Sequence, residues 1–264
     1  MWLKDWLIPF VLMIVSSRAG AAPQGMSPIR HMNESYESAS LRVHQRENYG
    51  ANFGNRATPE NVKQPLGNLD IYSIPELPSV EQVNAQFAYI RDTKFIDDSS
   101  LKFPRRISWL YPDDGCYVRA ELAGTYLKQR GFVVPKKIFV FGNLHANTKN
   151  SRYGYVEWWY HVAVTYRVGQ TAYVYDPAVN PQNPMTLEEW HRAVGGGGRG
   201  NAQYSVCNME TFDPGSACQE TRPHATSSTI FEQLGFLESE WDRLIDLRRD
   251  PYQELGNNPP WQRN

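Results

Sequence analysis

The 264-residue chain lacks the features of a nucleic-acid-binding or nucleotide-binding protein. Its 27 Lys and Arg residues are balanced by 28 Asp and Glu, so there is no excess positive charge for a phosphate backbone. There is no convincing repeat of about 20–50 residues and no Walker or Rossmann glycine pattern. The glycine run at 195–198 has neither the strand nor the Lys-Ser/Thr pair of a phosphate-binding loop, and we expect a plain loop. We therefore expect neither a nucleic acid partner nor a cofactor.

A hydrophobic run long enough to cross a bilayer is also missing. The apolar stretch at 6–15 is too short, but Lys4 precedes it and small residues follow at 19–21. This arrangement is typical of a signal peptide, and the alternative is an uncleaved anchor. We expect residues 1–21 to be removed on export, which would make the protein secreted or periplasmic.

Cysteine is scarce. No two of the three cysteines have the spacing of zinc ligands, so we expect no metal site. Export favours disulfides, and Cys207 and Cys218, which share one loop-like stretch, are the natural pair. Cys116 is then left over. In an exported protein such a thiol is inert and buried, engaged in an intermolecular link, or reactive.

Large apolar side chains are few in residues 22–76, which are rich in Pro, Gly, Ser and Asn. Such a segment buries too little surface to offset its ordering entropy. We expect it to be a pro-segment or a linker. Helical spacing of apolar residues starts at Val80, so the globular domain is predicted to span residues 77–264.

The segment around Cys116 has the pattern of a turn followed by a helix. Residues 111–115 are a turn, and the following residues are good helix formers with regularly spaced apolar positions. Asp113 or Asp114 can cap the start of this helix, and Gly131 can end it. The macrodipole and the unpaired N–H groups of the first turn favour a thiolate over a thiol at Cys116.

Strand patterns follow. Residues 155–168 alternate strictly, which predicts that the even-numbered residues face the core and that Trp159 and His161 share the other face. A two-residue turn at 169–170 pairs Val168 with Thr171 and Ala163 with Asp176. His161 and Asp176 are then diagonal neighbours on one face. Other elements are expected at 136–143 (strand), from Thr186 with Glu189 as a capping box (helix), and at 236–249 (helix).

These residues supply the parts of a nucleophilic acyl-transfer site. A thiolate attacks, an imidazole moves the proton, and a carboxylate orients the imidazole. The backbone N–H of Cys116 would face the developing oxyanion. Each residue alone has a structural reading; Asp176, which precedes Pro177, is equally a residue that closes a strand. The joint arrangement predicts a triad of Cys116, His161 and Asp176.

Five motifs resemble, in order and spacing, the bacterial secreted protein-glutaminases, also called protein-glutamine deamidases. They are YPDDGCYVRA (111–120), FVFGNLHANT (139–148), WWYHVAVTY (158–166), YVYDPAV (173–179) and PMTLEEW (184–190). The resemblance implies a papain- or transglutaminase-like α+β fold, in which the helix bearing the cysteine packs on an antiparallel sheet. It also implies hydrolysis of the side-chain amide of protein-bound glutamine to glutamate and ammonia, through a thioester on Cys116.

The resemblance further implies that Cys116 is the nucleophile, His161 the base and Asp176 the orienting carboxylate. It also implies a pro-segment over the cleft, with an activating protease as a partner. The substrates would be proteins or peptides with an accessible glutamine, and we expect a monomer. We expect Trp159 and Tyr117 to contact the substrate.

Two alternatives stay open. A transglutaminase or a cysteine peptidase would use the same triad, although the chain lacks the Cys-Gly-Ser-Cys-Trp segment of papain-type peptidases. The other alternative is a non-catalytic secreted binding module, in which Cys116 is a buried thiol. The reactivity of this thiol distinguishes the enzymes from the binding module.

Overall fold

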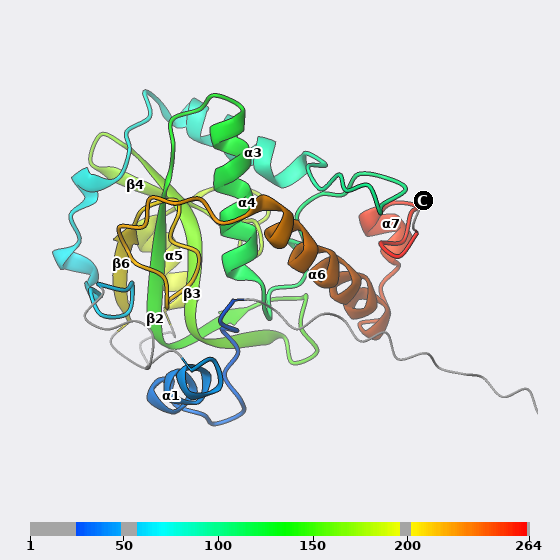
Figure 1. Ribbon diagram of the computed structural model, residues 1–264, viewed down its shortest axis with the longest axis horizontal. Helices are drawn as coiled ribbons and strands as arrows, with labels where there is room; N and C mark the ends of the chain where they lie inside the picture. The colour runs from blue at the N-terminus through cyan, green and yellow to red at the C-terminus, as the bar shows by residue number, and fades with distance from the viewer. Residues whose placement is uncertain (1–24, 49–56, 196–201, 263–264) are drawn as a thin grey trace, which may run out of the picture.

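The computed structural model describes residues 25–48, 57–195 and 202–262. The expected signal peptide and residues 196–198 of the glycine run lie outside these ranges. No helix in the described ranges is long and apolar enough to cross a membrane. The described chain forms one six-stranded sheet with helices on both of its faces (Figure 1).

The sheet has the strand order β1-β6-β2-β3-β4-β5, and every neighbouring pair is antiparallel. Its strands are β1 (Gln64–Pro65), β2 (Lys136–Asn147), β3 (Tyr155–Val168), β4 (Thr171–Tyr175), β5 (Met185–Thr186) and β6 (Gln203–Cys207). The prediction of an α+β protein with an antiparallel sheet is confirmed. The similarity of this fold to those of papain and transglutaminases stays a prediction.

The turn between β3 and β4 has the predicted register. Val168 lies opposite Thr171, and the pairing continues to Val164 opposite Tyr175. Gly169 has a φ of +58°, in the left-handed region that such a turn requires. The pairing ends there, so the N-terminal half of β3 is not covered by β4 on that edge.

The strict alternation predicted along β3 is wrong in its first half. Trp158 packs in the same apolar cluster as Ala163, whereas Trp159 packs with Tyr160 in the cluster on the opposite face. The strand changes face at Trp159 because the register with β2 shifts there: Tyr160 pairs with Phe141, but Trp158 pairs with Leu144. Two residues of β2 therefore oppose one of β3, which is a β-bulge.

The helices are α1 (Tyr36–Arg46), α3 (Val80–Asp92), α4 (Cys116–Gln129), α5 (Leu187–Val194), α6 (Thr226–Asp246) and α7 (Pro251–Leu255). The capping box of Thr186 and Glu189 at the start of α5 is confirmed. Gly131 follows the end of α4 with a φ of +82°, as the sequence suggested. The last long helix begins ten residues earlier than predicted, at Thr226 instead of position 236.

The predicted cap of α4 is wrong. Its N-cap is Gly115, and no side chain caps the helix. The Oδ1 atom of Asp114 accepts from the N–H of Gly115 at 2.6 Å, and its Oδ2 atom accepts from the hydroxyl of Ser27 at 2.7 Å. Asp113 instead pairs with Arg243. Each carboxylate therefore has a partner that is distant in the sequence, Arg243 for Asp113 and Ser27 for Asp114.

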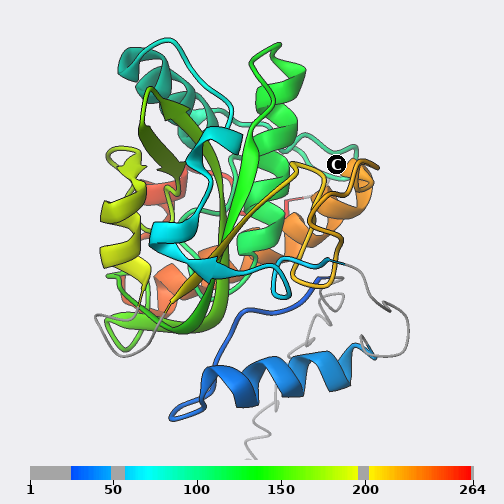
Figure 2. The same ribbon diagram turned by 90° about the vertical axis from the view of Figure 1, so that its left-hand side faces the viewer.

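Two apolar cores lie on opposite sides of the sheet. One contains residues of α4, α3 and α6 together with the β3 residues from Tyr160 onward at even positions. The other contains Trp190 and its neighbours on α5, together with Trp158 and Ala163. Figure 2 shows α4 and α5 on either side of the sheet.

The segment preceding residue 77 is more ordered than the loop-like leader that its composition suggested. It contains the eleven-residue helix α1, two short 3-10 turns (Leu66–Asn68 and Ile71–Ser73) and strand β1. Gln64 pairs with Tyr204 of β6, and Ile74 is 1% exposed. Residues from Gln64 onward are therefore built into the edge of the sheet.

Candidate active site

Cys116 is the first residue of α4, and its position depends on the glycine before it. Gly115 has a φ of +77°, which glycine adopts without strain. A Cβ atom at Gly115 would lie 2.8 Å from the ring of Phe236 on α6. Cys116 is a free cysteine and is 1% exposed. The thiol therefore lies at a helix N-terminus, as predicted, but buried.

Burial decides the protonation state of this thiol. It raises the pKa of Cys116 to about 12, while the Arg119 guanidinium lowers this pKa and the Asp114 carboxyl raises it. The sequence predicted that the helix N-terminus would favour the thiolate. That prediction is wrong for the chain with its leader in place, because the cost of burying a charge exceeds the stabilisation by the helix terminus and Arg119.

His161 and Asp176 form the predicted contact. The distance from His161 Nε2 to Asp176 Oδ2 is 2.8 Å, and the two residues are 1% and 3% exposed. The indole N–H of Trp190 donates to the same Oδ2 atom at 2.9 Å. Burial by itself raises the pKa of Asp176, but the His161 charge and the hydrogen bonds from His161 and Trp190 outweigh it and hold that pKa below its ordinary value. Asp176 is therefore an ionised orienting group for the imidazole.

The second ring nitrogen of His161 has no hydrogen-bond partner. It is the buried Nδ1 atom. The imidazole stacks on the indole of Trp158, with 4.4 Å between ring centroids and 10° between planes, so its orientation is fixed from two sides. Cys116 packs in the same apolar cluster as Tyr160 and Val162 of β3, and the backbone of Val162 lowers the pKa of the thiol.

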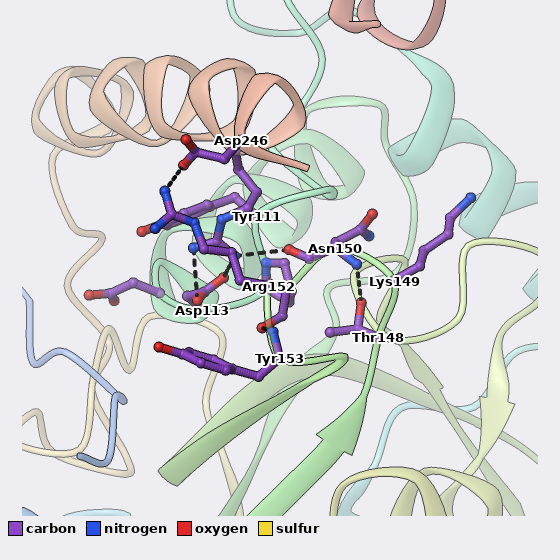
Figure 3. A network of polar contacts seen from close by, with 12 residues as sticks. Tyr111, Asp113, Thr148, Lys149, Asn150, Arg152, Tyr153 and Asp246 are labelled. Carbon is purple, nitrogen blue, oxygen red and sulfur yellow. Dashed lines mark hydrogen bonds and ion pairs between the residues drawn. The ribbon is translucent and has the colours of Figure 1, made fainter. Parts of the chain in front are cut away.

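The turn before Cys116 is held by a residue of α4 itself and by a residue of α6. Arg119, 2% exposed, donates to the carbonyl of Tyr111 at 2.9 Å and to that of Asp114 at 2.6 Å. From α6, Arg243 contacts both carboxylate oxygens of Asp113 at 2.7 and 3.1 Å. Arg243 also donates to the carbonyl of Asn150 in the β2–β3 turn at 2.9 Å, within the polar network of Figure 3. Because α4, α6 and the β2–β3 turn all contribute, the thiol is placed by tertiary contacts.

A short extended segment, residues 25–30, lies along the edge of β3 that β4 leaves uncovered; we call it the leader strand. The N–H of Trp159 donates to the carbonyl of Pro28 at 2.9 Å, and the N–H of Arg30 donates to the carbonyl of Glu157 at 3.1 Å. Ile29 is bridged to Trp158 in antiparallel orientation. The leader strand therefore extends the sheet beside the candidate triad.

Nearer to Cys116, side chains instead of the backbone of β3 make the hydrogen bonds to the leader strand. The hydroxyl of Tyr160 donates to the carbonyl of Met26, and the N–H of Met26 donates to Asp213 Oδ2 at 3.2 Å. The indole of Trp159 donates to the carbonyl of Ser27 at 2.9 Å. Met26 is 0% exposed and belongs to the same apolar cluster as Cys116.

The expected substrate-contacting residues both touch the leader strand. Trp159 donates to Ser27, as described, and the ring of Tyr117 lies 2.3 Å from where a Cβ atom on Gly25 would be. The hydroxyl of Tyr117 donates to Glu232 at 3.0 Å. A role of Trp159 and Tyr117 in substrate binding stays a prediction.

Cys207 and Cys218 form the predicted disulfide, with 4.6 Å between their Cα atoms. The loop that it closes contains Asp213, which is 2% exposed. Sequence reasoning missed Asp213 and Trp190, since neither lies in a recognisable spacing with Cys116. The described residues contain no group of three or more His, Cys, Asp and Glu side chains placed to hold a metal ion.

Comparison with known proteins agrees with the resemblance read from the motifs. Residues 83–194, which include Cys116, His161 and Asp176, match the model of a family described as a glutaminase. This match confirms the resemblance to the protein-glutaminase family over that segment. No curated protein matches the chain.

Several solved structures are similar. A crystal structure of pro-protein-glutaminase has 28% identity, covering 51% of this chain and 49% of that one, with a TM-score of 0.41. A crystal structure of protein-glutaminase has 22% identity, covering 70% and 92%, with a TM-score of 0.44. The NMR structure of protein-glutaminase from Chryseobacterium proteolyticum has 24% identity, covering 58% and 96%, with a TM-score of 0.41. The chain thus spans about half the length of the pro-protein-glutaminase that it matches.

Proposed function

We propose that this chain, whose residues 83–194 match the glutaminase family model, is an exported protein-glutamine deamidase that acts through Cys116, His161 and Asp176. The observation that carries the proposal is the buried contact of 2.8 Å between His161 and Asp176, with the free thiol of Cys116 beside the same strand. Acyl transfer by a thiol requires an oriented imidazole within reach of the sulfur, and the proposal is that His161 and Cys116 meet this requirement.

The proposed reaction has two halves. His161 takes the proton of the Cys116 thiol as the sulfur attacks the carbonyl carbon of the glutamine side chain, and gives this proton to the departing nitrogen, which leaves as ammonia. His161 then takes a proton from water, which attacks the thioester and releases glutamate and the thiol. Asp176 keeps the imidazole in one orientation and stabilises its charged form through both halves. The N–H of Cys116, at the start of α4, is placed to donate to the oxyanion.

We further propose that the leader strand and α1 form the inhibitory part of the pro-segment. Met26 is buried in the cluster of Cys116. Its unbranched side chain has a sulfur where glutamine has its amide carbon, so it fills the position of the substrate side chain without an amide to attack. The leader strand also explains why burial raises the pKa of Cys116.

Activation then requires a cut between α1 and β1. Gln64 pairs with β6, and Leu77 donates to the carbonyl of Arg167 at 2.7 Å, so the residues between them belong to the folded enzyme. A cut at 68–77, near the end of the segment expected to be the pro-segment, would separate β1 from the chain that continues into the sheet. A cut between Arg46 and Ala57 would release the leader strand and α1 and leave β1 in place.

The test is ammonia release from an unfolded, glutamine-rich protein, with the chain folded first and then cut at a protease site inserted between Arg46 and Ala57. Wild type should release ammonia and convert glutamine to glutamate, and Cys116→Ala should not. Incorporation of a primary amine in preference to water would instead identify a transglutaminase, and chain cleavage a peptidase. Absence of all three reactions, with an unreactive thiol after cutting, would leave the non-catalytic binding module.

A further inference from the structure

The leader strand contacts the enzyme through the side chains of Ser27 and Arg30 and also through its backbone. Its carbonyls at Met26, Ser27 and Pro28 accept hydrogen bonds from Tyr160 and Trp159. Its N–H groups at Met26 and Arg30 donate to the enzyme. Such contacts do not depend on which side chains the bound segment carries, and they are the way in which an exposed sheet edge binds an extended peptide.

Asp213 makes one of these backbone contacts and is held by its own turn. Its Oδ1 atom accepts from the N–H of Gly215 at 3.0 Å and from the N–H and hydroxyl of Ser216 at 3.1 Å each. Its Oδ2 atom is the one that accepts from the N–H of Met26. The turn orients the carboxylate, and the Cys207–Cys218 bridge closes the loop around it. The geometry therefore presents one carboxylate oxygen to the backbone of whatever segment lies at this position.

The position of that backbone relative to the thiol follows from Tyr160. Its hydroxyl donates to the carbonyl of Met26, the residue that Asp213 holds by the N–H. Burial, and then the charges of Cys116 and Asp213, raise the pKa of Tyr160 well above its ordinary value. Asp213 and Tyr160 together hold both ends of the backbone of the residue whose side chain lies in the Cys116 cluster.

We infer that Asp213 is a specificity-determining residue, which accepts a hydrogen bond from the main-chain N–H of the glutamine to be deamidated. The inference rests on the proposed deamidase function and on the leader strand occupying the substrate groove. It assigns the substrate class as an extended polypeptide segment. The glutamine lies at the position of Met26, and the residues that follow it run antiparallel to β3 at the positions of residues 27–30.

The inference predicts a discrimination between substrates that a triad alone does not provide. A glutamine within a peptide presents an amide N–H to Asp213 and a carbonyl to Tyr160. A glutamine that is followed by no further residues lacks the carbonyls that Trp159 contacts in Ser27 and Pro28. The main-chain contacts therefore select glutamine that is incorporated in a polypeptide.

Two substitutions isolate the contact, one in the enzyme and one in the substrate. Asp213→Asn keeps a carbonyl oxygen for the N–H groups of Gly215 and Ser216 but replaces the acceptor Oδ2 by a donor. Methylation of the glutamine main-chain nitrogen of a test peptide removes the donor. The matched control peptide is methylated two residues later, at the position that Pro28, which has no N–H, occupies in the leader strand. Asp250→Asn is the matched enzyme control, because Asp250 also accepts from an N–H of its own turn, at 2.9 Å, but at the start of α7.

The experiment measures kcat/KM for ammonia release from the acetylated, amidated peptide Ala-Gln-Ser-Ala-Ala-Ala and its two methylated forms, with the chain folded whole and then cut between Arg46 and Ala57. Wild type and Asp250→Asn should lose about 10- to 100-fold on methylation at the glutamine, the range for a hydrogen bond to a charged group, and little on methylation at the control position. Asp213→Asn should be reduced by a similar factor on the unmethylated peptide and show no further loss on methylation at the glutamine.

Two results would overturn the inference. If Asp213→Asn lowers kcat/KM equally for the unmethylated and the glutamine-methylated peptide, Asp213 has a structural role only. If the variant keeps the wild-type kcat/KM for both peptides, Asp213 does not contact the substrate. Absence of ammonia from every substrate, including the unfolded protein, would instead refute the proposed function, so the two failures are distinguishable.

Discussion

Trp190 donates its indole N–H to Asp176 Oδ2 at 2.9 Å, the same oxygen that His161 Nε2 contacts at 2.8 Å. Asp176 therefore links the strand that carries the imidazole to helix α5, which packs on the face of the sheet opposite to α4. This second hydrogen bond helps to keep the pKa of the buried Asp176 carboxyl low. An ionised Asp176 is the form that can orient and stabilise an imidazolium.

We predict that Trp190→Phe lowers kcat about 10- to 100-fold, because it removes one hydrogen bond from a buried carboxylate. The pH profile of kcat should change as well, since the remaining acid is harder to ionise. Trp241→Phe is the control for loss of a buried indole far from the triad. A drop in kcat that comes only with an equal loss of folded protein would contradict a role through Asp176.

The triad residues should act as a unit. Cys116→Ala, His161→Ala and Asp176→Ala are each expected to lower kcat by about 10³- to 10⁴-fold with the fold intact. The double variant of Cys116 and His161 should be little worse than Cys116→Ala alone, because the second substitution removes a group that has nothing left to activate. Losses that add up in the double variant would show that the residues do not share one reaction.

The pH dependence of thiol alkylation should report the release of the leader strand. With the leader strand in place, the pKa of Cys116 is about 12, so the iodoacetamide rate should rise about tenfold per pH unit from pH 6 to 10 without a plateau. After the cut, burial no longer opposes Arg119 and the helix N-terminus. The rate should then level off below about pH 8.5, the ordinary thiol value. Identical profiles before and after cutting would refute the zymogen proposal.

Gly25→Ala should activate the uncut chain. A Cβ atom at position 25 would lie 2.3 Å from Tyr117, and that ring is held by Phe212 and Phe236 and by its bond to Glu232. The leader strand must therefore move, and thiol alkylation at neutral pH should be faster than in wild type.

Gly67→Ala is the control for this substitution, because nothing lies within 4 Å of its added Cβ. It should leave the alkylation rate unchanged. Equal rates in Gly25→Ala, Gly67→Ala and wild type would show that the leader strand does not shield the thiol.

Removing the disulfide should lower both stability and substrate binding. The bridge joins residues 11 apart in the sequence, for which the chain-entropy model gives about 3 kcal/mol. The double variant of Cys207→Ser and Cys218→Ser should unfold at lower denaturant concentration and show a raised KM, because Asp213 lies in the released loop. Mass mapping should find Cys116 unpaired in the active wild type, and a bridge to Cys116 there would contradict the assignment.

Local sequence determined the part of the site whose residues lie close together in the chain. A two-residue turn and a period of two were sufficient to predict that His161 meets Asp176, because hairpin register is set by the turn and by the pleat. The turn at 111–115 and the residues that follow were also sufficient to predict the helix that begins at Cys116. The disulfide followed from cysteine count and compartment.

Tertiary structure decided what depends on distant partners. The change of face at Trp159 comes from an extra residue in β2, and the pKa of Cys116 is set by burial rather than by its own helix. Asp213 lies in a loop and Trp190 in a helix, and the sequences of these two segments do not indicate that either side chain lies at the candidate site. The order within the polar leader arises because Met26 and Arg30 find hydrogen-bond partners more than a hundred residues away. Composition reports how much apolar surface a segment has, but whether that segment is ordered depends on the surface that it meets.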